Sequence, residues 1–234
     1  MGKAIINVNN DFLNEINNLR ELGESRLKFL NKMYHHFNSL NRPINILETG
    51  AGHISNNGTF ASNTYIFSKM MKNIKGGRLI TVDVNEDHLN KCKEITKDFS
   101  DVIDYKLGDS VNILRSLSAD FVKSLDLIIL DSYDLFLFDP DPSAIHHLQE
   151  LLSLYTKLNK NCLIAIDDNY LPGNWVQWNW DDGRSEIFEI KDKLIGKGMY
   201  CDDFLIKNDW IRDPSVVSGG VNMFLYYHKS NFKL

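Results

Sequence analysis

The strongest constraint on the fold is a strict alternation of strand-length apolar runs with helix-length segments, from residue 44 to residue 166. The predicted strands are 44–47, 79–82, 102–107, 125–130 and 162–166. The predicted helices between them are 60–74, 86–99, 110–121 and 143–158. Such alternation favours parallel strands joined by crossover helices. We therefore predict an α/β fold, a doubly wound and mostly parallel sheet.

The segments on either side of this core add further elements. Apolar residues at helical spacing in residues 11–40 predict two lead-in helices, with Ser25 as a cap between them. Near the end, the pattern predicts a helix at 184–195 and strands at 200–206 and 221–228, which can pair antiparallel at the sheet edge. No repeat or linker-like segment divides the chain. We expect a single domain, 1–234, with N-terminal cap helices in 1–43 and a catalytic core in 44–234.

Composition excludes several classes of function. The chain has 26 basic and 31 acidic residues and a net charge of -5, without a basic block, so we expect no nucleic-acid partner. Cys92, Cys162 and Cys201 form no C-x-x-C pair and are read as reduced thiols. Because no signal-like segment or membrane-length apolar run is seen, we expect a cytoplasmic protein that does not bind membranes. A homo-oligomer is left open.

The polar residues directly after the predicted strands are the informative ones, because ligands bind at the carboxyl ends of an open parallel sheet. Every predicted strand is followed by an acid. The glycine turn around Gly50 and Gly52 lets backbone approach a ligand, but lacks the third glycine of a dinucleotide-binding turn. Asp83 is placed to accept hydrogen bonds from both hydroxyls of a ribose. Asp109 and Ser110 suit the adenine end of such a ligand.

The strings I-L-E-T-G-A-G, L-I-T-V-D-V-N, L-G-D-S-x-x-I-L and L-D-L-I-I-L-D resemble the successive motifs of class I S-adenosylmethionine-dependent methyltransferases. The resemblance covers about residues 44–228. It implies the sheet order 3-2-1-4-5-7-6 of a Rossmann-like methyltransferase fold, with an antiparallel edge, and S-adenosylmethionine as cofactor. A sulfonium cofactor has no phosphate, which agrees with the missing third glycine. The cofactor-binding residues it implies are Glu48, Gly50, Gly52, Asp83, Asp109 and Ser110.

The residues at the ends of the fourth and fifth predicted strands resemble those of one subgroup of these methyltransferases. Asp131 and the string I-D-D-N-Y-L-P-G are similar to the metal site of cation-dependent O-methyltransferases acting on catechols and caffeoyl esters, and the paired acids also resemble those of macrolide-sugar O-methyltransferases. This implies a magnesium ion held by Asp131, Asp168 and Asn169, with Asp167 as substitute for one of them. Hard oxygen ligands suit such a cation, which would acidify a bound hydroxyl. The alternative is that these residues only cap a helix and form a turn.

The expected activity is methyl transfer to a hydroxyl of a small molecule. Catechol enzymes carry a lysine three residues after the first metal ligand, whereas this chain has Asp134, so a sugar or polyol acceptor is favoured. Asp131, Asp134 and His53 are the candidate catalytic residues, with His53 ranked low. Trp175, Trp178 and Trp180 either stack on the acceptor or anchor a loop.

Two other functions stay open. The string I-I-L-D-S-Y-D is similar to part of spermidine-synthase-type aminopropyltransferases, although their glycine-rich first loop is absent. A noncatalytic cofactor-binding protein of the same fold is the second. The product distinguishes the first alternative, since aminopropyl transfer releases methylthioadenosine and methyl transfer releases S-adenosylhomocysteine.

Overall fold

The computed structural model describes residues 10–18, 23–51, 62–180 and 183–231. Its main sheet has the order β3-β2-β1-β4-β5-β10-β9, with the short β8 paired to β5. Pairs among β1 to β5 are parallel, and β8, β9 and β10 pair antiparallel. The strands are β1 (Ile44–Thr49), β2 (Gly77–Asp83), β3 (Ile103–Leu107), β4 (Leu127–Leu130), β5 (Leu163–Tyr170), β8 (Ile195–Gly196), β9 (Trp210–Arg212) and β10 (Asn222–His228). The predicted α/β class and sheet order are confirmed, and β8 makes eight strands where seven were expected.

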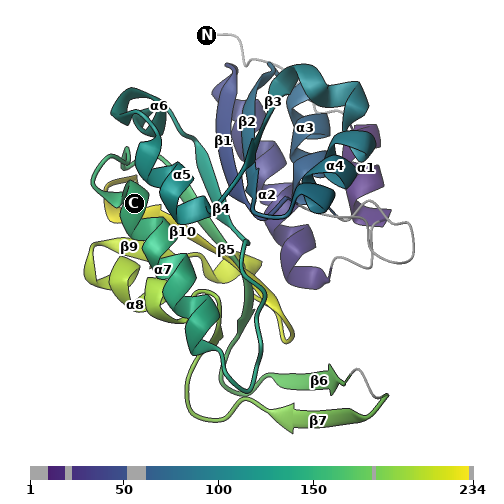
Figure 1. Cartoon of the computed structure of the whole chain (residues 1–234), viewed down its shortest axis with the longest axis vertical. Helices are drawn as coiled ribbons and strands as arrows, with labels where there is room; N and C mark the ends of the chain where they lie inside the picture. Colours follow the sequence, from purple (N-terminus) through teal and green to yellow (C-terminus); the bar gives the residue numbers. More distant parts are fainter. Residues whose placement is uncertain (1–9, 19–22, 52–61, 181–182, 232–234) are drawn as a thin grey trace, which may run out of the picture.

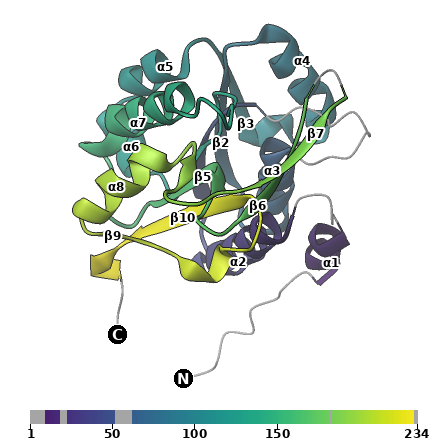
Figure 2. The ribbon, with the colours of Figure 1, turned by 90° about the horizontal axis from the view of Figure 1, so that it is seen from below.

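Helices cover both faces of the sheet (Figures 1 and 2). Figure 1 shows α1 to α4 on one side and α5 to α8 on the other. The helices are α1 (Asn10–Asn18), α2 (Glu24–Leu40), α3 (Asn63–Asn73), α4 (Glu86–Ile95), α5 (Ser110–Ser116), α6 (Ala119–Lys123), α7 (Asp141–Tyr155) and α8 (Met199–Lys207). Within the described residues, no helix has the length and apolar character needed to cross a membrane.

The two faces of the sheet bury separate apolar clusters. One joins α1, α2 and α3 to the sheet through residues such as Phe29, Phe67 and Ile46, all fully buried. The other joins α7 and α8 to the opposite face through residues such as Leu151 and Leu205. Strands buried on both faces read as continuous apolar runs, which is why β4 and β5 were recognisable in the sequence.

The prediction of a strand at 200–206 is wrong, because this segment is helix α8. Cys201 and Leu205 are both fully buried and four residues apart, so one helical face packs against α7. The edge strand is instead β9, in which Trp210 pairs with His228 of β10. The expected antiparallel edge therefore exists, with a shorter strand than predicted.

The prediction of a helix at 184–195 is also wrong. Strands β6 (Trp175–Asn179) and β7 (Ser185–Glu189) form a two-stranded hairpin in which Val176 pairs with Phe188. Gly183 has a φ of 84°, a left-handed conformation that suits a tight hairpin turn. The hairpin follows the carboxyl end of β5 and projects beneath the body of the molecule (Figure 1).

The lead-in helices are confirmed as α1 and α2, but Ser25 is no cap. Gly23 precedes α2, and Ser25 lies in its first turn. Its Oγ donates to the carbonyl of Val216 at 2.6 Å and accepts from the N–H of Met223 at 3.1 Å. These bonds attach the start of α2 to the sheet, near the carboxyl end of β5.

Candidate functional site

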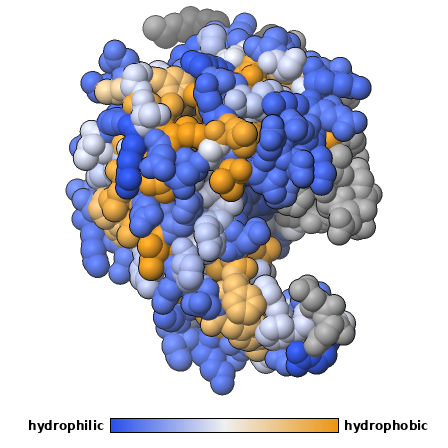
Figure 3. Space-filling model, in the orientation of Figure 1, coloured by the Kyte–Doolittle hydropathy of each residue, from blue (hydrophilic) through white to orange (hydrophobic). Residues whose placement is uncertain are grey.

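Two adjoining cavities lie at the carboxyl ends of the parallel strands. The larger, of about 430 Å³, extends from the end of β2 to the end of β5, and the smaller, of about 240 Å³, lies beside α5 and α7. Gly50, Asp83, Val84 and Ser132 line both, so the two form one crevice. Figure 3 shows a notch between the body and the β6–β7 hairpin. The crevice lies where ligands bind in sheets of this type.

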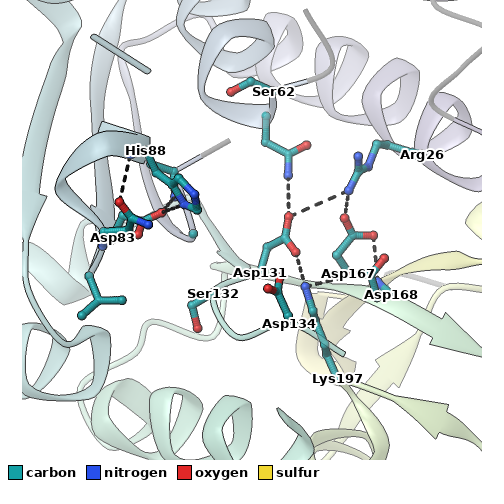
Figure 4. A pocket seen from close by; sticks show the side chains of 15 residues that line it. Arg26, Ser62, Asp83, His88, Asp131, Ser132, Asp134, Asp167, Asp168 and Lys197 are labelled. Carbon is teal, nitrogen blue, oxygen red and sulfur yellow. Dashed lines mark hydrogen bonds and ion pairs between the residues drawn. The ribbon is translucent and has the colours of Figure 1, made fainter. Parts of the chain in front are cut away.

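Asp83 ends β2 and its carboxylate is held in place by two backbone N–H groups. Ala51 donates to Oδ2 at 3.0 Å and Asn85 donates to Oδ1 at 2.7 Å. Each carboxylate oxygen can accept more than one hydrogen bond, so both retain capacity for a ligand. The next residue, Val84, is 75% exposed and gives the crevice an apolar wall. Figure 4 shows Asp83 on one side of the crevice and the acids of β4 and β5 on the other.

Asp109 and Ser110, which the sequence predicts to lie near an adenine, line the smaller cavity. Asp109 also caps α5, since its Oδ1 accepts from the N–H of Asn112 at 2.8 Å. Ser110 Oγ lies 3.0 Å from His146 Nε2, and Glu150 lies 3.4 Å from the same nitrogen. The hydrogen bond to Glu150 raises the pKa of His146 above its ordinary value. His146 thus belongs to the lining of the smaller cavity.

Glu48 lies apart from both cavities, unlike the other described residues of the expected cofactor set. It is 1% exposed, and Oε2 accepts from the hydroxyls of Thr64 at 2.6 Å and Thr81 at 3.1 Å. Oε1 has no hydrogen-bond partner in the described residues. Burial raises the pKa of Glu48 to about 8. The expectation that Glu48 faces the ligand is therefore corrected: its side chain packs behind the crevice, against α3.

Gly50 lines the crevice, as expected, and its lack of a side chain has a structural cause. Its φ is 82°, and a Cβ there would lie 2.2 Å from the carbonyl oxygen of Asp131. Only glycine lets the turn after β1 pass this close to the end of β4. Gly52 and His53, predicted to contact cofactor and to act as a base, lie outside the described residues.

Three acids gather at the other end of the larger cavity. Asp131 follows β4, and Asp167 and Asp168 come from the end of β5. Alternation along a strand would send Asp167 and Asp168 to opposite faces. Asp168 instead has a φ of 49°, and this left-handed residue breaks the alternation, so both neighbours line the cavity. The sequence favoured Asp168, with Asp167 as a substitute, and the backbone conformation brings both to the cavity.

Lys197 lies between two of these acids. Its Nζ is 2.5 Å from Asp131 Oδ1 and 2.9 Å from Asp168 Oδ2, and its side chain is only 4% exposed. Burial alone would lower the pKa of Lys197, but the two carboxylates outweigh it and raise the pKa above its ordinary value. The same ammonium holds the pKa of Asp168 below its usual range, against the effect of burial. Figure 4 shows the lysine reaching the two acids from below.

The local chain explains how a lysine can be buried there. β8 pairs with the end of β5, Asn169 opposite Gly196, and the N–H of Lys197 donates to the carbonyl of Asp168. Gly196 has a φ of 148°, and a Cβ on it would lie 2.3 Å from the Asp168 carbonyl oxygen. A Cβ on Gly198 would lie 2.7 Å from Asn169 Oδ1. The tripeptide Gly-Lys-Gly therefore lies directly against β5 and directs its one side chain into the cavity.

Arg26 is the second cation at this end. It comes from the first turns of α2, forms an ion pair with Asp167, and lies 3.9 Å from Asp131 Oδ2. The Nδ2 of Asn63, in α3, also lies 3.5 Å from that Asp131 oxygen. The second lead-in helix, α2, thus contributes Arg26 to the site itself, in addition to covering the sheet.

Asn169 does not fit its predicted role as a metal ligand. It is fully buried, and its Oδ1 accepts from the N–H of Gly198 at 2.7 Å. Its Nδ2 donates to the carbonyls of Ile166 and Asp167 at 2.8 and 2.9 Å. The amide therefore ties β5 to the Gly196–Gly198 segment, and the fully buried Asn169 is not among the residues that line the cavity. This corrects the expectation drawn from the D-D-N string.

A divalent cation does not fit the remaining donors either. Asp131 and Asp168 share the Lys197 ammonium, and Asp167 is paired with Arg26. Over the ranges that the structure describes, no three His, Cys, Asp or Glu residues are arranged to hold a metal ion. Two carboxylates that already share a monovalent cation at 2.5 and 2.9 Å would have to release it before a magnesium ion could enter. Asp131 does not cap the next helix of this face, since α7 begins at Asp141 and its N-cap is Pro140.

Asp134 and the tryptophans occupy different places. Asp134 is exposed and lines the larger cavity beside Asp131. Trp178 and Trp180 belong to an aromatic cluster between the hairpin and the segment after β4: Phe138 stacks on Trp180 at 5.1 Å between ring centroids, and Phe136 meets Trp178 at 5.6 Å. Trp175 is 64% exposed. Trp178 and Trp180 therefore anchor the hairpin, as the second of the two interpretations held.

Comparison with known proteins places the molecule among solved structures of similar shape. No family model matches the chain, and no curated protein matches it. A structure from Pyrococcus horikoshii OT3 has a TM-score of 0.49 and 15% identity over 88% of this chain and 91% of that one. The structure of the 1,6-didemethyltoxoflavin-N1-methyltransferase of Burkholderia thailandensis, with S-adenosylhomocysteine bound, has a TM-score of 0.45 and 15% sequence identity. The match covers 93% of this chain and 84% of that one.

A third solved structure matches over a shorter length. It is a SAM-dependent methyltransferase from Geobacter sulfurreducens with S-adenosyl-L-homocysteine, which has a TM-score of 0.40 and 12% identity over 63% of this chain. The chain spans 49% of its length. These likenesses are weak ones of overall shape, so the chemistry of the site has to be argued from its own residues.

Proposed function

We propose that this protein is an S-adenosylmethionine-dependent methyltransferase that acts on a hydroxyl of a small molecule. The observation that carries the proposal is the charge of the crevice. Its lining carries six acids, Asp83, Asp109, Asp131, Asp134, Asp167 and Asp168. The lysine and arginine of the described lining, Lys197 and Arg26, are both paired with acids. Such a crevice repels the phosphates of a dinucleotide and attracts a cationic sulfonium.

The residues present fit this cofactor. The fixed carboxylate of Asp83 suits a ribose diol, and exposed Val84 together with Ser110 and Tyr133 offers an apolar wall and polar groups for an adenine ring. Bound there, S-adenosylmethionine supplies an electrophilic methyl group whose bonding electrons leave with the sulfur. The ring end would lie in the smaller cavity and the methyl group would face the larger one.

The larger cavity would hold the acceptor. Its volume of about 430 Å³ suits a small molecule. Asp134 is exposed in it and forms no ion pair or hydrogen bond within the described residues, so we assign it as the group that takes the acceptor's proton. Asp131 is paired with Lys197 and would orient the acceptor rather than remove the proton. A polyol fits these carboxylates, which accept hydrogen bonds from its other hydroxyls.

Binding and product analysis test the proposal. Isothermal titration is expected to show that S-adenosylmethionine and S-adenosylhomocysteine bind and that NAD does not. Incubation with a panel of sugars and polyols is expected to release S-adenosylhomocysteine. Release of methylthioadenosine would indicate aminopropyl transfer, and cofactor binding without turnover would indicate a binding protein. Absence of any cofactor binding would refute the proposal.

A further inference from the structure

Lys197 is the most deeply buried cation of the crevice, and the proposed cofactor does not require it. It comes from a segment more than sixty residues after Asp131 in the chain, yet contacts both Asp131 and Asp168. Burying an ammonium is costly unless it is paired and hydrogen-bonded. The chain meets that cost with two carboxylates and with two glycines that let the backbone reach β5.

The carboxylates around Lys197 have the arrangement of a cation site. They come from the ends of two neighbouring strands, and their oxygens Asp131 Oδ1 and Asp168 Oδ2 converge on one point. The side chain of Asp167, on the same cavity, is only 5% exposed. Converging carboxylates without a cation between them would repel one another. The point on which they converge is occupied by the Lys197 ammonium.

We propose that Lys197 is a built-in cation that takes the place of a divalent metal ion at the acceptor end of the crevice. An ammonium has three N–H donors, and the two carboxylates use two of them in the described part of the chain. The third is left for an oxygen of the acceptor. Lys197 thus positions the acceptor hydroxyl and balances the charge that grows on its oxygen as the proton leaves. This role of the third donor rests on the proposed function, whereas the occupation of the cation site does not.

The test measures metal binding directly, without cofactor or acceptor. Mn²⁺ is titrated into the wild-type protein and into Lys197→Ala, and bound Mn²⁺ is followed by loss of the free-ion signal in electron paramagnetic resonance. We expect the wild type to show no Mn²⁺ site, and Lys197→Ala to bind one Mn²⁺ per chain, at least about 10-fold more tightly than the wild type. Adding Asp131→Asn to Lys197→Ala should abolish this binding. Lys193→Ala, an exposed lysine just before β8, is the matched control and should behave like the wild type.

The outcomes separate cleanly. Mn²⁺ binding to the wild type that Asp131→Asn removes would overturn the proposal, and so would a Lys197→Ala protein with no gain in Mn²⁺ affinity. Should Lys197→Ala fold poorly, Lys197→Gln is used, and Mn²⁺ should raise its melting temperature without raising that of the wild type. S-adenosylhomocysteine titration of the same proteins is read separately, so a failed cofactor assignment cannot be mistaken for a failed cation assignment.

Discussion

The two ends of the crevice hold their acids in different ways. At the cofactor end, Asp83 is fixed by the N–H groups of Ala51 and Asn85, and Asp109 by that of Asn112. At the acceptor end, Asp131 and Asp168 are held by the side chain of Lys197, which comes from a distant part of the chain. Backbone donors orient a carboxylate but leave its full charge, whereas an ion pair cancels it. The first end therefore keeps its negative charge for a ligand, and the second is largely neutralised from within.

The largest effect should come from removing the internal cation. Lys197→Met leaves Asp131 and Asp168, whose side chains are 21% and 39% exposed, close together without a counter-charge. This should cost about 3 kcal/mol of folding free energy, the lower end of the range for a fully buried pair. Urea unfolding followed by circular dichroism measures this loss. Lys193→Met should change the free energy of unfolding by less than about 0.5 kcal/mol. Equal stability of the two variants would show that the acceptor end is not neutralised in this way.

A substitution of Glu48 tests whether this acid, which is buried behind the cofactor end, is uncharged while the acids of the crevice wall keep their charge. Because its pKa is raised to about 8, the folded protein holds Glu48 neutral at pH 7, whereas the unfolded chain ionises near pH 4.5. The stability that Glu48 contributes is full below pH 4.5 and is lost as pH rises toward 8. Glu48→Gln should therefore stabilise the protein by roughly 3 kcal/mol at pH 7 and by almost nothing at pH 4. Thermal melts across this range measure the difference, and a gain independent of pH would contradict it.

Substitutions of Asp83 and of Asp131 should affect different steps, cofactor binding in the first case and methyl transfer in the second. Asp83→Ala removes an acceptor for the ribose hydroxyls and leaves them unpaired, at about 1 to 3 kcal/mol for each effect, so S-adenosylhomocysteine should bind about 100-fold more weakly. Asp131→Ala should change that affinity little and abolish methyl transfer. Calorimetric titration and product release measure the two effects. Asp87→Ala, an exposed acid of α4, is the matched control. Equal affinity losses for Asp83→Ala and Asp131→Ala would remove the distinction between the two ends.

His146 should give the smallest effect. Its Nε2 lies 3.0 Å from Ser110 Oγ in the smaller cavity, so His146→Ala removes one hydrogen bond that orients a cofactor-end residue. Such a bond contributes about 0.5 to 1.5 kcal/mol, which corresponds to a loss of roughly 2- to 12-fold in S-adenosylhomocysteine affinity. Ile145→Ala, the exposed neighbour on α7, should have no effect. A loss of S-adenosylhomocysteine affinity as large as that of Asp83→Ala would indicate that the main cofactor contact lies on α7, not at Asp83.

Most of the fold could be predicted from the sequence, because buried parallel strands and crossover helices leave strong local patterns. Segments that bury only one face could be predicted less well. The segment of α8 was predicted to be a strand. In the structure it is a helix, and packing against α7 buries Cys201 and Leu205, which lie four residues apart on one helical face. β7 was taken for a helix, although pairing with β6 across the turn at Gly183 decides its conformation.

The site residues likewise fall into those that local sequence patterns predict and those that only long-range packing brings in. The sequence by itself located Asp83, Asp109, Ser110, Asp131, Asp167 and Asp168, because a residue directly after a parallel strand must lie at the carboxyl edge of the sheet. It did not determine what neutralises them. Lys197 and Arg26 carry no local signal beyond the Gly-Lys-Gly string, and they reach the acids only because β8 pairs with β5 and α2 packs across the sheet. Local pattern sets where the acids lie, whereas the charge they present to a ligand depends on long-range packing, which only the tertiary structure decides.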